Sequence, residues 1–221
     1  MKKILFLIML LTVSCGRNAG DFTAAEKALI HRTDAGIESM VPEGTMRVLT
    51  IADPADNEVL RAPSSYLSEK ALRSEDYAAL CSLMVATVTH PSQDGVGLAG
   101  PQVGLNRRVV AVQRFDKEGE PFEVYPNIRI VCLSDSTAYG PEGCLSVPDM
   151  RADVLRSQEV VIEYADMEAL KAWGSGKSQE DRHSSADYAI PVRRDTVSGF
   201  TAVIFQHEID HLEGILYIDR L

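Results

Sequence analysis

Two histidines stand four residues apart near the C-terminal end of this 221-residue chain, in the run Gln206 to His211. The surrounding residues predict a helix that starts after Ser198, a suitable N-cap, and ends before Gly214. Residues four apart on a helix lie on the same face. His207 and His211 are therefore expected to project together from one face of this helix.

The pair has the spacing of a metal-binding helix motif. Both imidazoles can hold one divalent ion, and Glu208, one position after His207, can reach water bound to that ion. A carboxylate placed there accepts the water's proton and returns it to a leaving group, as a general base and acid. A chance match, with Glu208 in a solvated ion pair, is the alternative for so short a motif.

Cys144 is a candidate third ligand. It lies in the run Glu142 to Pro148, where a glycine precedes it and an extended segment follows. Two histidines and one thiolate leave a fourth position open, which is the arrangement of a catalytic rather than a structural tetrahedral site. Taken alone, a single cysteine is more often an inert buried thiol.

A third run, Gly95 to Gln102, is rich in glycine. Glycines allow the backbone to approach a ligand closely, and Gln102 offers an amide donor to a developing oxyanion. An ordinary turn between a helix and a strand is the alternative interpretation of this run.

Hydrophobic periodicity organises the rest of the chain. It predicts a helix from Ser74 to His90 and four strands, the last two of them paired, over residues 108–113, 122–125, 129–133 and 159–164. Residues 166–194 are rich in Gly, Ser and charged residues and are expected to form a surface insertion.

The N-terminus has the parts of a secretory signal: two lysines, an apolar run and a small residue before Cys15. The site is similar to a bacterial lipobox, in which the cysteine receives lipid, although Thr12 stands where an aliphatic residue is usual. The expectation is an exported lipoprotein of the bacterial envelope with a membrane tether through Cys15, residues 1–15 as signal, and residues 16–45 as an N-terminal extension or tether. If the signal is not used, the protein is cytoplasmic.

Composition excludes two classes of protein. Four cysteines in a chain of this length do not make a disulfide scaffold; Cys81 and Cys132 lie in apolar runs and are expected to be small buried residues, with their pairing left open. Lys and Arg number 22 against 32 for Asp and Glu, a formal charge of −10. This excess of acid disfavours nucleic acid as a partner.

Taken together and in this order, GVGLAGPQ, EGCLSVP and QHEIDH resemble the three signature motifs of the peptide deformylases. The resemblance runs from about Val48 to Leu221. It implies an α+β fold in which antiparallel sheets surround a central metal-binding helix, and a catalytic domain over residues 46–221. It also implies hydrolytic removal of the formyl group from N-formylmethionyl peptides, with one divalent metal ion, Fe(II), or Zn, Ni or Co in its place.

The resemblance also assigns roles to individual residues. Cys144, His207 and His211 match the metal ligands, and Glu208 matches the general base and acid. Gln102, together with the backbone N–H of Leu145, matches the oxyanion stabiliser. Positions that line the substrate cleft are matched by Val96, Gly97, Glu142 and Arg151. Phe200 and Val203 share the metal-bearing face of the helix and are expected to form the pocket for a methionine side chain.

Two other functions remain open. A metalloprotease with the same histidine motif usually takes a third ligand downstream, where the chain offers only Glu213 and Asp219. The second alternative is a catalytically silent surface lipoprotein that keeps the fold as a binding module. The presence of all three candidate ligands, of Glu208 and of Gln102 argues against this alternative.

One departure from the family pattern, Gly100 in place of an alanine, is expected to loosen the turn in which it lies.

Overall fold

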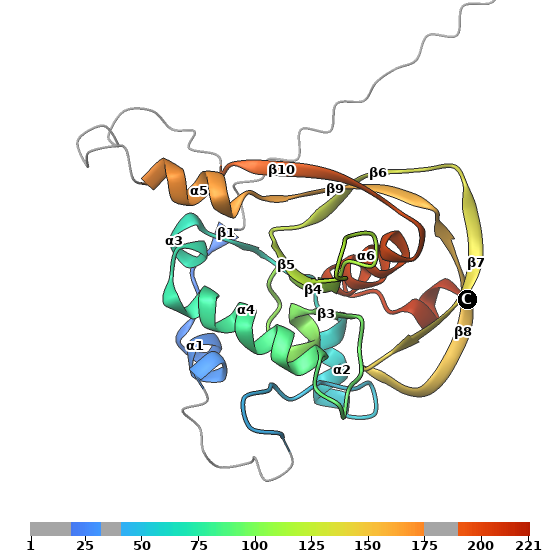
Figure 1. The fold of residues 1–221 in the computed structure, drawn as a ribbon. Helices are drawn as coiled ribbons and strands as arrows, with labels where there is room; N and C mark the ends of the chain where they lie inside the picture. Colours follow the sequence, from blue (N-terminus) through green and yellow to red (C-terminus); the bar gives the residue numbers. More distant parts are fainter. Residues whose placement is uncertain (1–18, 32–40, 175–189) are drawn as a thin grey trace, which may run out of the picture.

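The computed structural model describes residues 19–31, 41–174 and 190–221. Within these ranges the chain forms helices, short 3-10 helices and strands (Figure 1). In chain order they are β1 (Ala19–Gly20), α1 (Ala24–His31), α2 (Pro54–Arg61), β2 (Tyr66–Leu67), α3 (Glu69–Leu72), α4 (Glu75–Val88), β3 (Gly97–Ala99), η1 (Gly100–Val103), β4 (Val109–Gln113), β5 (Phe122–Pro126), β6 (Arg129–Leu133), β7 (Thr137–Cys144), β8 (Val147–Ser157), β9 (Glu159–Ala165), α5 (Met167–Gly174), β10 (Val192–Ser198), α6 (Gly199–Leu212) and η3 (Tyr217–Arg220).

Antiparallel strands form the three larger sheets, with strand orders β3-β4-β5, β10-β9-β6 and β7-β8. The predicted pairing of residues 129–133 with 159–164 is confirmed, with Ile130 opposite Ile162. α6 lies in the middle of the molecule with strands on several sides (Figure 1). This arrangement confirms the α+β class and the central helix.

Strand β4 divides the interior into two cores because its side chains alternate between the two faces of the sheet. Val109 and Ala111 join the core that packs against α4, whereas Val110 and Val112 join the core that packs against α6. All four side chains are fully buried. A strand covered on both faces explains why this segment is apolar at consecutive positions.

The start of α4 and the end of α6 lie where the sequence predicts them. α6 also begins directly after Ser198, but the Ser198 side chain makes no capping hydrogen bond, and α4 ends at Val88, two residues before the predicted end. The Ser74 hydroxyl accepts a hydrogen bond from the Tyr77 N–H at 3.2 Å and caps α4. Gly214 follows α6 at a φ of 73°, and a Cβ there would lie 2.2 Å from the Arg61 carbonyl oxygen, so glycine is required. Within the described ranges, no helix combines the length and hydropathy needed to cross a bilayer.

The N-terminal extension is folded onto the domain over residues 19–31. β1 pairs in parallel with β2, and Phe22 and Ile30 are buried in the same core as α4. Arg107, itself 7% exposed, binds the Glu26 carboxylate through Nε at 2.6 Å and donates to the Asp21 carbonyl at 2.7 Å. Over residues 19–31 the chain is therefore an extension folded onto the domain and not a free tether, because two apolar anchors and a half-buried ion pair hold it. Residues 1–18, and with them Cys15, lie outside the described residues.

We expect Arg107→Met to release this extension without unfolding the domain. The substitution removes the cation that satisfies Glu26 and two backbone carbonyls, a loss of about 1–3 kcal/mol for a charged group left unpaired. Hydrogen exchange measured by mass spectrometry should show faster exchange in α1 and little change in α6. Equal acceleration in both helices would contradict a local anchoring role.

Two further expectations are wrong, and the bounds of a third are too wide. Both ends of the insertion predicted over residues 166–194 belong to regular structure: Leu170 on α5 is fully buried, and β10 pairs with β9. The middle of this segment, residues 175–189, lies outside the described residues. Cys132 is exposed because β6 is an edge strand with a register shift at this point. The turn at Gly100 is tight, because a Cβ there would lie 2.6 Å from the carbonyl oxygens of Leu105 and Arg107. Cys81 is half-buried, and among the described residues both cysteines are free.

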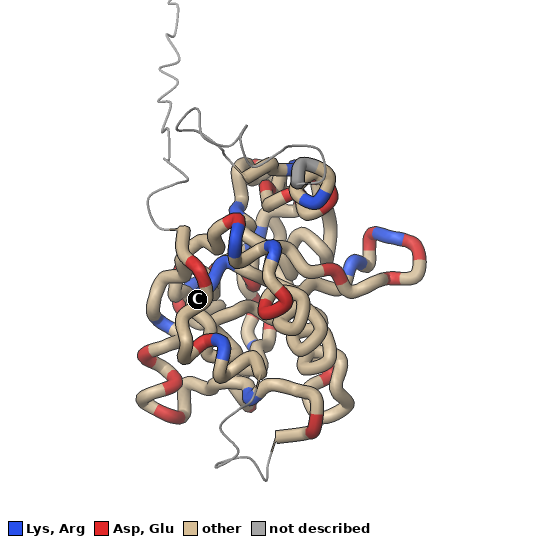
Figure 2. Tube along the Cα trace, turned by 90° about the vertical axis from the view of Figure 1, so that its left-hand side faces the viewer, with Lys and Arg blue, Asp and Glu red and all other residues tan. Residues whose placement is uncertain are grey.

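Acidic and basic positions are interspersed along the described trace, as Figure 2 shows in the view turned by 90°. Many of them are paired, and several pairs join elements that are distant in the sequence. Arg108 binds Glu213 at 2.7 Å, and Arg129 binds Glu163 at 2.6 Å. The first ion pair holds the C-terminal end of α6 to the residue that precedes β4, and the second joins β6 to β9.

Candidate metal centre and active site

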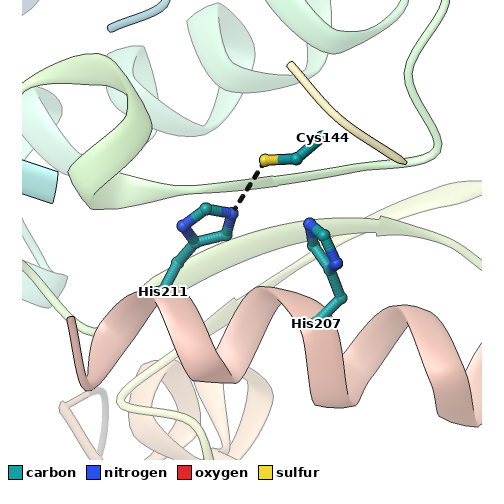
Figure 3. A group of neighbouring side chains, drawn as sticks. All are labelled: Cys144, His207 and His211. Atoms are coloured by element: carbon teal, nitrogen blue, oxygen red, sulfur yellow. Dashed lines mark hydrogen bonds between the residues drawn. The ribbon is translucent and has the colours of Figure 1, made fainter. Parts of the chain in front are cut away.

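The structure brings Cys144, His207 and His211 together (Figure 3). One donor atom from each lies within 4.8 Å of the other two, and Cys144 Sγ is 3.3 Å from His211 Nε2. The histidines come from α6 as predicted, and the cysteine ends β7, where the register with β8 shifts between Gly143 and Cys144. Such an irregularity re-aims a side chain. Here it accompanies a thiol directed at the helix.

This donor set fits a divalent metal ion. A thiolate and two imidazoles are the ligands of zinc and of related transition metals. Sulfur and nitrogen donors at about 2.3 and 2.0 Å from one tetrahedral ion are about 3.5 Å apart, close to the observed Cys144–His211 separation. Three protein ligands leave one position for water or substrate.

His207 is oriented by Glu142. The His207 Nδ1 atom lies 2.8 Å from Glu142 Oε2, and Arg156 Nε lies 2.7 Å from Oε1 of the same carboxylate. Burial raises the pKa of Glu142, but its hydrogen bonds to His207 and Arg156 lower that pKa to about 2. Because an ionised carboxylate only accepts, Nδ1 must donate, which leaves Nε2 for the metal.

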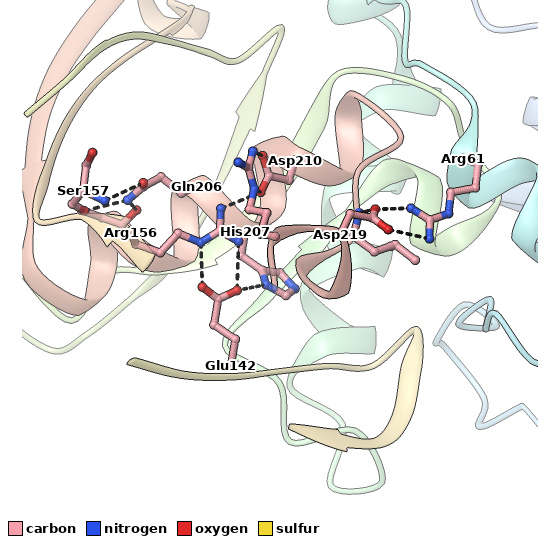
Figure 4. A network of polar contacts seen from close by, with 11 residues as sticks. Arg61, Glu142, Arg156, Ser157, Gln206, His207, Asp210 and Asp219 are labelled. Carbon is pink, nitrogen blue, oxygen red and sulfur yellow. Dashed lines mark hydrogen bonds and ion pairs between the residues drawn. The ribbon is translucent and has the colours of Figure 1, made fainter. Parts of the chain in front are cut away.

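The network behind Glu142 could not be recognised from the sequence. Arg156, on β8, binds both Glu142 and Asp210, and its side chain is 4% exposed (Figure 4). Gln206 clamps α6 to the end of the same strand, since its amide exchanges two hydrogen bonds with the Ser157 backbone, at 3.0 and 2.8 Å. No motif signals these contacts, because their partners are 14 to 54 residues apart.

Glu208 lies beside the metal ligands and is 4% exposed. Its Oε2 is buried without a hydrogen-bond partner among the described residues. Burial raises the pKa of Glu208 to about 7. A buried, unpaired carboxylate oxygen is unfavourable for folding, and such groups occur preferentially where they take part in chemistry.

The absence of a side chain at Gly97 leaves room for the Glu208 carboxylate. A Cβ at Gly97 would lie 2.3 Å from Glu208 Oε1 and 2.7 Å from its Cδ. The sequence indicated Gly97 only as a cleft position. The structure adds that glycine is required there because the carboxylate occupies the place of a side chain.

Gly97→Ala should therefore reduce turnover more than it reduces stability. The new methyl group displaces the flexible end of Glu208 rather than the backbone, and a misplacement of about 1 Å can lower the rate by about 10²-fold. Initial rates on a formylated peptide, beside a thermal melt, measure both effects. Gly140→Ala on β7 is the matched control, because a Cβ there meets nothing within 4 Å.

Gln102 is fixed in one orientation in η1. Its Oε1 accepts a hydrogen bond from the Ala99 N–H at 2.8 Å, so its Nε2 is left to donate to Ser146 Oγ at 3.3 Å and toward Cys144 Sγ at 3.6 Å. The side chain is buried, and Leu145 follows the cysteine on the wall of the same pocket. Gln102 and Leu145, the residues predicted to supply the oxyanion donors, thus both line this pocket.

A pocket of about 750 Å³ opens in front of these groups. Its lining contains every residue predicted for substrate binding, namely Val96, Gly97, Glu142, Arg151, Phe200 and Val203. Phe200 is 55% exposed and packs against Phe115 at the rim, with ring centroids 5.3 Å apart. Sequence reasoning missed Asp94, Asp149 and Met150, which line the pocket from irregular segments or a strand end and carry no motif.

Glu142 needs a correction among these residues. It borders the pocket, but its side chain is 5% exposed and both carboxylate oxygens bind Arg156 or His207. Its carboxylate therefore holds the His207 ring in place and is not free to contact a substrate.

Comparisons with known proteins agree with this geometry. The family model described as polypeptide deformylase matches residues 46–172 and 186–221. Peptide deformylase 2 of Vibrio cholerae is 37% identical over 166 residues, which cover 74% of this chain and 85% of that protein. The peptide deformylase of Leptospira biflexa is 31% identical over 183 residues, covering 79% and 87%.

A solved structure is similar in fold as well. The class I type b peptide deformylase from Acinetobacter baumannii with Met-Ala-Ser bound gives a TM-score of 0.63 at 28% identity, covering 80% of this chain and 98% of that one. The fold, the three converging motifs and the extent of these matches lead to one conclusion. This chain belongs to the polypeptide deformylase family and is an enzyme of that family, a metal-dependent hydrolase that removes N-formyl groups.

Proposed function

We propose that the substrate is an N-formylmethionyl peptide and that one ion, held by Cys144, His207 and His211, serves its deformylation. The observation that supports this most is the position of the three donors within 4.8 Å of one another, beside the unpaired carboxylate oxygen of Glu208. Two of the three, Cys144 and His207, line a pocket of about 750 Å³ together with Glu208. The Acinetobacter relative with Met-Ala-Ser bound supports a peptide ligand. Val203 and Phe200 give one wall of the pocket the apolar character that a methionine side chain requires.

Each polar group in the pocket takes one part of the reaction. A divalent metal at this site supplies Lewis acidity. Glu208 accepts the proton of the attacking water and passes it to the departing peptide amine, while formate leaves. In this proposal Gln102 Nε2 and the Leu145 N–H donate to the oxygen of the formyl group as negative charge develops there; both residues line the pocket.

We infer Fe(II) as the native metal, with Zn, Ni or Co able to replace it. The mixed thiolate and imidazole donor set accepts all four. Elemental analysis of protein purified without oxygen identifies the ion. Iron at one equivalent supports the assignment, and zinc at one equivalent with full activity contradicts it.

Gln102→Leu should lower turnover by about 10² to 10³-fold, the loss expected for one oxyanion donor. The leucine keeps the volume of the side chain but removes the amide that Ala99 now fixes in place. Metal content should stay at the wild-type level because Gln102 is not a ligand. Unchanged turnover would exclude the oxyanion role.

One assay separates the proposed activity from the alternatives. Metal-loaded protein is incubated with formyl-Met-Ala and with a longer unformylated peptide, and both formate and internal cleavage products are measured. A deformylase releases formate only. Internal cleavage would indicate a protease, and no product from either peptide would indicate a binding module.

We also propose that the protein is exported and lipidated at Cys15, which would direct it to formylated peptides outside the cytoplasm. The support is sequence alone: the lysines, the apolar run and the cysteine. Wild-type protein should incorporate radiolabelled palmitate and fractionate with membranes, and Cys15→Ala should do neither. A wild-type protein that is unlabelled and cytosolic, with Met1 retained, would overturn export.

A further inference from the structure

The C-terminal 3-10 helix η3 is connected to His207 of the candidate metal centre through two sets of side-chain contacts. One route is a chain of charged side chains that ends at His207, and the other is an aromatic contact with the same histidine. The roles proposed above use neither Arg220 nor Tyr217, the two residues of η3 that make these contacts.

The charged route alternates in sign. Arg220 binds both oxygens of Asp210, with Nε at 2.5 Å from Oδ2. Asp210 Oδ2 accepts from Arg156 at 2.6 Å, and Arg156 in turn holds the Glu142 carboxylate that orients His207. The three middle groups are buried: Arg156 is 4% exposed, Glu142 6% and Asp210 8%.

Because Arg220 also binds Asp210, it affects how Arg156 divides its hydrogen bonds between Glu142 and Asp210. Without Arg220, one guanidinium would have to neutralise two buried carboxylates, Glu142 and Asp210. A buried carboxylate that loses a partner attracts the remaining cation more strongly. Arg156 would shift toward Asp210, and Glu142 would hold the His207 imidazole less firmly.

The aromatic contact involves the face of the His207 ring, whereas Glu142 binds its Nδ1 atom. The Tyr217 ring stacks on the His207 ring, with centroids 6.0 Å apart and planes 25° from parallel. Tyr217 is 1% exposed, so it is locked by its own packing. The η3 helix is itself anchored, since Asp219 binds Arg61 on α2 and accepts from the Leu216 N–H at 2.8 Å (Figure 4).

We propose that η3 is a positioning element for the metal ligand His207, acting through Arg220 and through the Tyr217 ring. The inference rests on the metal ligation proposed above. It assigns to the last turn of the chain a role in metal affinity and geometry rather than in folding alone. Outer partners of a ligating histidine commonly change metal affinity by about 10 to 100-fold when removed.

The test uses Co(II) as probe, because its visible absorption reports both occupancy and coordination geometry. Metal-free wild-type protein, Arg220→Met, Arg220→Lys and Tyr217→Leu are titrated with Co(II). We expect the Kd of Arg220→Met to rise about tenfold, with a shifted absorption spectrum. Arg220→Lys should be intermediate, because an ammonium restores the charge without the two-pronged contact. Tyr217→Leu should also bind more weakly.

Arg107→Met is the matched control. It removes a buried arginine from an ion pair at the N-terminal extension, so it lowers stability without touching the network of His207. Wild-type Co(II) affinity in this control, with reduced affinity in Arg220→Met, supports positioning. Wild-type affinity and spectrum in Arg220→Met would overturn the proposal, as would an equal loss in both variants. Because Co(II) binding is measured apart from formate release, failure of the proposed activity is distinguishable from failure of this inference.

Discussion

Glu208→Ala is expected to lose turnover by about 10² to 10⁴-fold or more while the protein keeps its metal. The carboxylate is buried beside the ligands, and one of its oxygens has no partner among the described residues, so it is available to take a proton. Formate release and metal content are measured on the same preparation. Glu208→Gln, which keeps the shape, should be equally inactive if the charge and not the packing matters.

Glu213→Ala provides the control for this experiment. Glu213 directly follows the same helix, but its carboxylate binds Arg108 outside the pocket. Its replacement should leave turnover near the wild-type level. A loss of metal in step with activity in Glu208→Ala would mean that Glu208 supports the site structurally, and its role as a proton carrier would then be excluded.

Removal of any one of the three ligands should abolish both stoichiometric metal binding and turnover. Lewis acidity contributes several kcal/mol to transition-state stabilisation, and each 1.36 kcal/mol is tenfold in rate, so the expected loss is about 10³-fold or more. Metal analysis of Cys144→Ala, His207→Ala and His211→Ala, each after dialysis, measures the first effect. A chelator should inactivate the wild-type enzyme, and added metal should restore it.

Cys132→Ala is the matched control for the cysteine variant. Cys132 is an exposed free thiol on β6 and borders neither the pocket nor the ligands. It should retain one equivalent of metal and wild-type turnover. Full occupancy in any of the three ligand variants would remove that residue from the set of ligands.

The sequence alone determined the features that depend on local periodicity. His207 and His211 share a face because they are four apart on a helix. The strands over residues 129–133 and 159–164 follow from short runs rich in β-branched residues. The Ser74 cap depends on its immediate neighbours, and the positive φ of Gly214 is likewise a local signal for the end of a helix. The three motifs, taken in order, indicated the family and the reaction.

Only the tertiary structure decided what each side chain meets. The Glu142 carboxylate turns to His207, Arg156 joins two buried carboxylates, and Arg220 closes the network from the last turn of the chain. Gly97 faces Glu208, and Glu26 reaches Arg107. These partners are between 10 and 111 residues apart in the sequence. Their contacts leave no periodic trace because a buried charge is satisfied by whichever opposite charge the packing brings near it, and packing depends on the whole chain.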